Sequence, residues 1–277
     1  MTENLAVVQH YDAGDLHERL RFALTQAGLD QKPLTPTDLA PLDQFHTRGL
    51  AATADLASLA GIGSHARVLD IGSGLGGPSR YLAATFGCQV TGIDLSQSFV
   101  EAATYLTARA GLDDRVRFQR ASAETLPFLD GSFDILWTQH VAMNVADRPQ
   151  MYREAFRVLR PGGRFAINDI VAGNGEPLHF PVPWSRTPET SFLLAPAAMR
   201  AVLEEQGFKV IAWADRTEDA KGWSAEQQQA RAQVGGAPPA LGLHVAMGPD
   251  FPTWSANLGR NMREGRIGVV QAVMERP

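Results

Sequence analysis

Several features that many proteins use are scarce in this sequence. Cys88 is the single cysteine, so no internal disulfide can form, and we expect it to lie in the core. No secretory leader and no apolar run long enough to cross a bilayer are present, which predicts a cytoplasmic protein without a membrane partner. Lys and Arg form no run and the net charge is −5, so nothing predicts nucleic-acid binding. These absences favour a small molecule as the partner.

The chain also lacks internal repeats and low-complexity segments, and its 277 residues fit one large domain, residues 1–277. Apolar strands alternate with helices, which is typical of an α/β fold with a mostly parallel sheet and helices on both faces. We expect strands at residues 67–71, 89–93, 116–119, 133–137, 163–170, 208–213 and 268–274. We expect helices at residues 15–28, 49–61, 78–86, 96–110, 148–159 and 196–205, and a loop around Pro33, Pro36 and Pro41.

A glycine-rich turn follows the first of these strands. Gly72, Gly74 and Gly77 allow the backbone to approach a ligand closely, and the next helix presents unpaired N–H groups to it. Asp94 follows at the spacing of a ribose-binding acid, so the turn alone is compatible with a dinucleotide. Asp70, just before the glycines, favours a different ligand, because its carboxylate would repel a pyrophosphate and attract an ammonium or sulfonium group.

Two further motifs lie downstream. Residues 123–134 run from Ala-Glu-Thr-Leu-Pro-Phe to Asp-Gly-Ser-Phe-Asp, and residues 157–165 read Arg-Val-Leu-Arg-Pro-Gly-Gly-Arg-Phe. With the glycine turn, they resemble the class I S-adenosylmethionine-dependent methyltransferases over about residues 64–172. The resemblance is closest to the small-molecule branch, which includes the ubiquinone and menaquinone biosynthesis methyltransferases and the sarcosine and dimethylglycine N-methyltransferases. It implies S-adenosylmethionine as cofactor and a Rossmann-like seven-stranded sheet whose last strand is antiparallel.

The resemblance also implies cofactor-binding residues. Asp94 would accept hydrogen bonds from both ribose hydroxyls, since Ser96 already suits the N-cap of the next helix. Ser122 stands where relatives carry an aspartate for the adenine amine, so this bond should be weaker, while the backbone N–H of Ala123 stays available. Glu124 is expected to be a solvated surface acid. The complete expected set is Asp70, Gly72, Ser73, Gly74, Gly77, Asp94, Leu95, Ser122, Ala123 and Gln139.

The acceptor is expected beyond the carboxyl ends of the strands, where parallel sheets bind ligands. Long connections at residues 171–195 and 215–266, and an N-terminal helical arm at residues 1–62, should cap this rim and determine specificity. His140 follows the fourth strand and is either a structural histidine, a substrate ligand or the catalytic general base. The expected substrate-binding residues are Tyr11, His46, Met143, Trp184 and His244. No cluster has metal-ligand spacing, so we expect no metal.

The function predicted first is therefore methyl transfer from S-adenosylmethionine to nitrogen, oxygen or carbon of a small molecule. A second hypothesis is a protein of the same fold that binds this cofactor without transferring methyl, such as a cyclase or a regulatory subunit. A nicotinamide oxidoreductase is third, and Asp70 and the turn at residues 161–163 argue against it. The acceptor and the oligomeric state, a homo-oligomer included, stay open.

Overall fold

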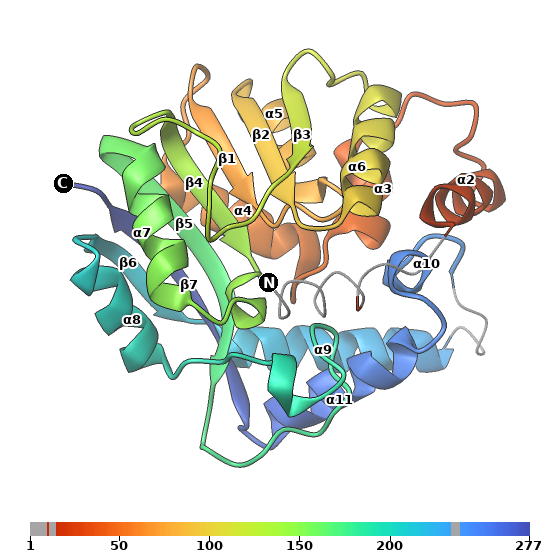
Figure 1. Cartoon of the computed structure of the whole chain (residues 1–277). Coiled ribbons are helices and arrows are strands. Elements are labelled where there is room, and N and C mark those ends of the chain that lie inside the picture. The colour runs from red at the N-terminus through yellow and green to blue at the C-terminus, as the bar shows by residue number, and fades with distance from the viewer. Residues whose placement is uncertain (1–9, 11–14, 234–238) are drawn as a thin grey trace.

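The computed structural model describes residue 10 and residues 15–233 and 239–277. Its centre is a seven-stranded sheet in the order β3-β2-β1-β4-β5-β7-β6 (Figure 1). β7 runs antiparallel to both of its neighbours, and the other strands are parallel, so the predicted topology is confirmed. The strands are β1 Arg67–Ile71, β2 Gln89–Asp94, β3 Val116–Arg120, β4 Phe133–Gln139, β5 Leu159–Ala172, β6 Lys209–Asp215 and β7 Ile267–Glu275.

Side chains alternate between the two faces of the sheet, and each face is covered by helices. Leu69 and Ile71 of β1 pack in one cluster with residues of α7 and α8. Val68, just before Leu69, belongs to the opposite cluster with residues of α4 and α5. Near-continuous apolar strands result, because a parallel sheet is buried on both sides. The covering helices are α4 Gly49–Ala60, α5 Gly77–Phe86, α6 Gln97–Arg109, α7 Arg148–Val158 and α8 Pro196–Glu205.

The strand order has a consequence for ligand binding. β1 lies between β2 and β4, so the chain builds outward from β1 in one direction and then crosses to β4 on its other side. Ligands of open α/β sheets bind at such a switch point, beyond the carboxyl ends of the strands. The glycine turn after β1 and the residues after β4 lie at this point.

The N-terminal arm contains one helix more than expected. The expected first helix is present as α2, Leu16–Gln26. A second helix, α3, occupies Pro36–Asp43, where a loop was predicted, and that part of the prediction was wrong. Thr35 and Asp38 form a reciprocal capping box, and Pro36 occupies the first turn, where a missing N–H costs nothing. Pro41 lies inside this short helix and has no N–H to donate to a backbone carbonyl. The helix forms nevertheless, with its first turn closed by the capping box.

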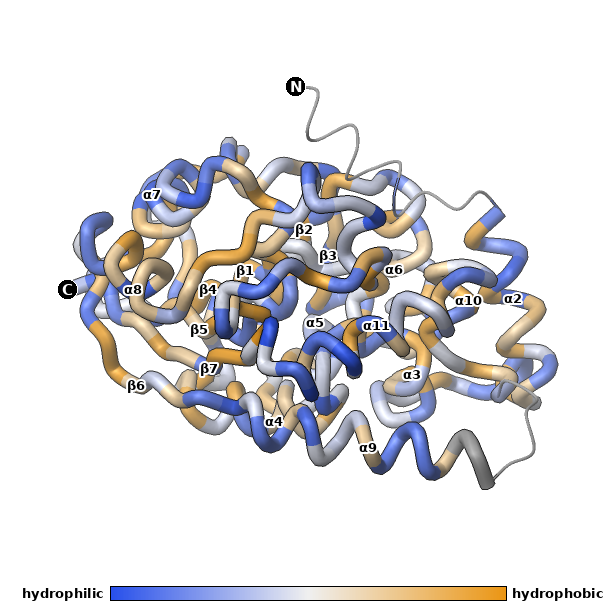
Figure 2. The backbone as a smooth tube through the Cα atoms, turned by 90° about the horizontal axis from the view of Figure 1, so that it is seen from below, coloured by the Kyte–Doolittle hydropathy of each residue, from blue (hydrophilic) through white to orange (hydrophobic). Residues whose placement is uncertain are grey.

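The connections after β5 and β6 hold the remaining helical elements. They are the short 3-10 helix η2 at Pro188–Thr190, α9 Thr217–Gln233, α10 Leu243–Met247 and α11 Phe251–Arg263. Another 3-10 helix, η1 Ala142–Asn144, follows β4. α9 and α11 lie together at one end of the strands, and α10 lies beside α2 (Figure 1). Figure 2 shows the largely hydrophilic course of α9. Within the described ranges, no helix is both long and apolar enough to span a membrane.

Candidate active site

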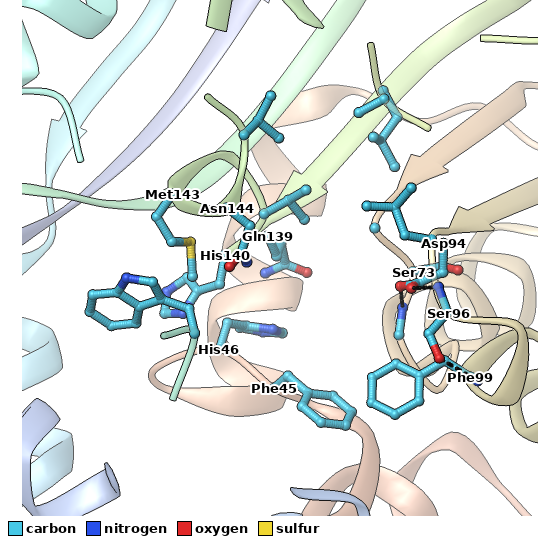
Figure 3. A pocket seen from close by; sticks show the side chains of 18 of the residues that line it. Phe45, His46, Ser73, Asp94, Ser96, Phe99, Gln139, His140, Met143 and Asn144 are labelled. Atoms are coloured by element: carbon cyan, nitrogen blue, oxygen red, sulfur yellow. Dashed lines mark hydrogen bonds between the residues drawn. The ribbon is translucent and has the colours of Figure 1, made fainter. Parts of the chain in front are cut away.

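A large cavity opens at the carboxyl ends of β1, β2 and β4. It encloses about 1250 Å³ of empty space, part of which is open to solvent. The turns after these strands form one side, and residues of the N-terminal arm and of both long connections form the other. Figure 3 shows Asp94, Ser73 and Ser96 on one side of the space and His46, His140 and Met143 on the other.

The glycine turn forms the bottom of this cavity. Gly72 has φ +72° and Gly74 has φ +52°, a region that L side chains rarely adopt. A Cβ on Gly72 would lie 2.5 Å from Cγ2 of Val141, so the turn also needs the space. The N–H groups of Gly72 and Ser73 donate to the carbonyl of Ile93 at 2.8 and 2.9 Å, which anchors the turn to β2. The buried Oγ of Ser73 has no partner among the described residues, so a ligand can take its hydrogen bond.

Asp94 ends β2 and lines the cavity beside this turn. Its Oδ2 accepts the N–H of Gly74 and its Oδ1 accepts the N–H of Ser96, both at 2.9 Å. Ser96 is the N-cap of α6, as predicted, and its hydroxyl accepts from Phe99 N–H. Burial raises the pKa of Asp94, and the backbone donors oppose that shift. Each carboxylate oxygen accepts more than one hydrogen bond, so both can still bind hydroxyls of a ligand.

Two of the expected cofactor residues do not line the cavity. Asp70 is buried behind the turn, where its carboxylate accepts the Ser79 hydroxyl at 2.6 Å. Burial raises the pKa of Asp70 to about 7, and the nearby Asp94 charge adds to the shift. Gly77 begins α5, and a Cβ there would lie 2.5 Å from the carbonyl oxygen of Asp43. Gly77 therefore makes room for the N-terminal arm.

The expected adenine end is formed by Leu95, Ser122 and Ala123, all of which line the cavity. The Ser122 oxygen accepts the N–H of Glu124 at 3.2 Å and keeps its own hydrogen to donate. Glu124 was expected on the surface, and that expectation was wrong, because its half-buried side chain lines the cavity next to Ser122. Phe99 from α6 closes this end, a contribution that the sequence analysis missed.

Gln139, the last residue of β4, is held in one orientation. Its Oε1 accepts the indole N–H of Trp137 at 2.9 Å and the hydroxyl of Thr53 at 3.1 Å. Because indole only donates, the amide oxygen must face Trp137, and the amide NH2 must point the other way. Gln139 lines the cavity, and its buried Nε2 has no partner in the described part of the chain. The site thus offers a fixed, unused donor.

His140 lines the cavity directly after β4, as the sequence predicted. Its φ of +55° is unusual for a residue with a side chain, and its N–H donates to the carbonyl of Asn168 at 2.8 Å. The ring Nε2 lies 3.4 Å from the Thr47 hydroxyl. Burial, with a smaller contribution from His46, lowers the pKa of His140 well below its ordinary value. The imidazole is therefore neutral at pH 7 and keeps one nitrogen able to accept a proton.

His46 lies opposite, with its ring centroid 6.0 Å from that of His140. Its Nε2 donates to the carbonyl of Gly49 at 2.9 Å, because a carbonyl only accepts. Burial lowers the pKa of His46 to about 4, and the bond to Gly49 offsets part of that shift. His46 is a second neutral imidazole in the wall.

The remaining expected substrate residues divide into three cases. Met143 and Trp184 are buried side chains that line the cavity, and the Trp184 indole N–H donates to Ser191 Oγ at 2.9 Å. His244 lies on α10 and does not line the cavity. Tyr11 lies outside the described residues. No group of three His, Cys, Asp or Glu side chains that could hold a metal occurs within residues 15–233 or 239–277.

Both long connections contribute residues to the cavity. Pro183 and Trp184 come from the first connection, and Met247, Phe251 and Leu258 come from the second. Phe251 and Leu258 are seven residues apart on α11, so they share one face of that helix. The sequence analysis did not identify these two, although this spacing in an amphipathic cap helix was a usable signal.

Comparison with known proteins agrees with this geometry. Residues 69–167, which include the turn, Asp94 and His140, match the family described as a methyltransferase domain. The chain is thus similar to that family over residues 69–167, which is less than half of its length. The match ends within β5, so both long connections and the N-terminal arm lie outside it.

The methyltransferase domain has curated relatives. The chain is 40% identical to methyltransferase GfsG of Streptomyces halstedii over 48% of each chain. It is 33% identical to the sarcosine/dimethylglycine N-methyltransferase of Halorhodospira halochloris over 56% of each chain. The chain thus spans about half the length of the curated relatives that it matches.

Solved structures share the methyltransferase fold over a larger part of the chain. The [4+2]-cyclase SpnF has a TM-score of 0.72 at 23% identity, covering 99% of this chain and 97% of that one. Geranyl diphosphate C-methyltransferase from Streptomyces coelicolor A3(2) has a TM-score of 0.72 at 18% identity, covering 100% of this chain and 99% of that one. The predicted Rossmann-like fold is confirmed.

Proposed function

We propose that this protein is an S-adenosylmethionine-dependent methyltransferase that acts on a small-molecule acceptor. The observation that carries the proposal is the position of Asp94, whose carboxylate is fixed by Gly74 N–H beside a cavity that continues to His140. We further propose that residues 1–277 act as one domain, in which the arm at residues 1–62 and the caps at residues 171–195 and 215–266 enclose the acceptor.

The residues present fit this cofactor. Asp94 can accept from the ribose hydroxyls, and the Ser73 hydroxyl, which has no partner among the described residues, is a donor suited to the cofactor's carboxylate. Asp70 does not line the cavity, but its carboxyl group lies buried behind the turn, where its charge can favour a nearby ammonium or sulfonium group without direct contact. Backbone N–H of Ala123 and the side chain of Ser122 are suited to the adenine edge. The cofactor, when bound, supplies an activated methyl group on a sulfonium, which is already a good leaving group.

Catalysis by this chain then consists mainly of positioning. Holding two reactants in line and in contact can contribute up to ~7–11 kcal/mol to lowering a barrier. The caps provide apolar walls that exclude water, and Gln139 provides a donor whose direction is fixed by Trp137. We propose His140 as the residue that accepts a proton from the acceptor, because its ring is neutral and faces the cavity.

Release of S-adenosylhomocysteine tests the function directly. We expect release that depends on acceptor when the protein is incubated with S-adenosylmethionine and a panel of small amines, phenols, alcohols and quinols. Binding of S-adenosylmethionine is measured in parallel by calorimetry. Tight binding with no release over the whole panel would contradict methyl transfer and favour a non-transferring protein of this fold, such as a cyclase.

The His140→Gln variant tests whether His140 accepts the proton of the acceptor. Glutamine keeps a polar side chain of similar reach but cannot take up a proton, so release with a hydroxyl acceptor should fall by about 10²–10⁴-fold. Cofactor affinity should stay unchanged. Equal rates in the variant and the parent protein would leave His140 as a structural residue.

Asp70 predicts that cofactor binding releases a proton. Its pKa is raised to about 7 by burial, so much of the carboxyl group is protonated at about pH 6.5 before binding. A cation nearby favours the carboxylate, so binding should release up to about one proton, and affinity should rise with pH up to about pH 7. Calorimetry in two buffers of different ionisation enthalpy measures this release. The Asp70→Asn variant should show no proton release. If the parent protein releases no proton on binding, the carboxyl group of Asp70 does not respond to the positive charge of the cofactor.

A further inference from the structure

The cavity walls carry very little charge. Among the described residues that line the cavity there is no Lys or Arg, and the acidic side chains there are Asp43, Asp94 and Glu124. The segments outside the described residues, 1–9, 11–14 and 234–238, contain no Lys or Arg in their sequence either. No cationic side chain of the cavity is therefore available to bind an anionic acceptor.

The three acidic groups lie away from the acceptor end. Asp94 borders the expected nucleoside end (Figure 3), and Glu124, whose N–H bonds Ser122, lines the cavity there too. Asp43 is paired with Arg80 through a 2.7 Å bond in which both side chains are fully buried. No unpaired carboxylate among the described residues thus lines the end of the cavity near His140, so none of those residues offers a counter-charge to a cationic acceptor there.

Four arginines of the arm, the caps and α7 are engaged in other contacts. Arg48 pairs with Asp55 at 2.7 Å, and Arg260 pairs with Glu264 at the same distance. Arg148 donates to backbone carbonyls and to the hydroxyl of Tyr152. Arg186 is exposed and lies over the ring of Trp254, with its guanidinium carbon 5.4 Å from the ring centroid. None of the four lines the cavity.

The walls of the acceptor end are apolar and come from four parts of the chain. Met143 follows β4, Ile170 lies on β5, and the cap segments supply the others. Removing a phosphate or carboxylate from water into such surroundings without a partner is strongly unfavourable, whereas an apolar skeleton gains from the same burial. The walls are Met143, Ile170, Trp184, Met247, Phe251 and Leu258.

Several polar side chains line this end, His46 and Asn144 among them, and two of the set, Gln139 and His140, differ in kind (Figure 3). Gln139 Nε2 is a donor without a partner among the described residues, and neutral His140 has one ring nitrogen that accepts. A hydroxyl group both donates and accepts, so it can satisfy both groups at once. A bare carbon can satisfy neither of them.

We propose that the acceptor is an uncharged, largely apolar molecule and that the group methylated is a hydroxyl placed between Gln139 and His140. This inference rests on the proposed function. In the reaction, the hydroxyl oxygen forms its bond to the methyl carbon as the carbon–sulfur bond breaks, and the electron pair of that bond stays on sulfur. The hydroxyl proton passes to the His140 ring and then to solvent, so charge and atoms balance.

Four probes with one aromatic skeleton test the charge class. They are 2-naphthol, 2-naphthyl phosphate, 2-naphthoate and N,N,N-trimethyl-2-naphthylammonium, titrated calorimetrically at about pH 7 into the full chain saturated with S-adenosylhomocysteine. We expect 2-naphthol to bind at least about tenfold more tightly than each charged probe. A charged probe that binds as tightly as 2-naphthol would overturn the proposal, and so would a failure of all four to bind.

Two matched variants locate the binding. Phe251→Ala should weaken binding of 2-naphthol by at least about tenfold, because it removes an aromatic wall. Phe22→Ala removes an aromatic side chain that is 67% exposed on α2 and should change nothing. Equal binding by the Phe251→Ala variant and the parent would overturn the proposed location. Failure of S-adenosylhomocysteine itself to bind would instead contradict the proposed function, so the two failures are distinguishable.

Discussion

Asp94→Asn is expected to weaken S-adenosylmethionine binding by about 10²–10⁴-fold. The carboxylate is already fixed by the N–H groups of Gly74 and Ser96, each at 2.9 Å, so it is preorganised to accept two ribose hydroxyls. Hydrogen bonds to a charged group contribute ~1.5–3 kcal/mol each, and every ~1.4 kcal/mol is tenfold in affinity. Asparagine also turns an NH2 group toward one of the two backbone donors. Isothermal titration calorimetry with S-adenosylmethionine measures the loss.

The matched control is Asp130→Asn. Asp130 has a side chain that is 78% exposed and pairs with Arg157 at the surface, so cofactor affinity should not change. A thermal unfolding curve for each variant checks that the fold is retained. If the Asp94→Asn variant is folded and binds with unchanged affinity, the ribose assignment fails, and with it the observation on which the proposed function rests.

The features that the sequence predicted well depend on local chemistry. β1 was predicted with its observed bounds, because an apolar run ends at a glycine turn whose φ values only glycine adopts readily. Ser96 was identified as an N-cap because its hydroxyl bonds a backbone N–H three residues on. His140 was placed at the rim because side chains at carboxyl ends of parallel strands face the same edge.

Features that depend on distant parts of the chain could not be predicted in this way. Gly77 fits a ligand-binding pattern, yet the space above it is taken by Asp43, which lies far away in sequence. Asp70 fits a ligand charge, yet its carboxylate bonds Ser79 on the next helix. Phe251 reaches the cavity only because α11 packs over the rim. Packing between arm, cap and sheet decides these positions. The spacing of Phe251 and Leu258 marks one face of α11, but it does not say what that face packs against.

The Arg80–Asp43 pair connects the N-terminal arm to the cofactor turn. Arg80, on α5, is fully buried, and its guanidinium donates to Asp43 Oδ2 at 2.7 Å and to the Leu75 carbonyl at 2.6 Å. A further bond reaches Thr107 Oγ1 on α6 at 3.0 Å. One side chain thus holds α3, the glycine turn and α6 together. Removing one partner of such a buried pair leaves a charge without compensation.

Arg80→Ala is expected to destabilise the protein by ~3–5 kcal/mol, which corresponds to a fall in Tm of roughly 6–20 °C. Asp43→Ala should have an effect of similar size. The double variant should lose less than the sum, since neither charge is then left alone. Arg200→Ala is the control, because its pair with Glu204 is about half exposed and should contribute little. Additive effects of the two buried substitutions would show that the pair is not energetically coupled.

The pH dependence of this loss follows from Asp43. Burial raises its pKa to about 6 even with Arg80 beside it, whereas an unfolded aspartate titrates near 3.8. The native state therefore holds more protons than the unfolded state between these values, and this group's contribution to stability falls as pH rises to about 6. Without Arg80, the pKa of Asp43 rises further, so the fall extends to higher pH. The destabilisation by Arg80→Ala should thus be larger at about pH 8 than at about pH 5.5, and an equal loss at both would show that Asp43 does not stay buried in the variant.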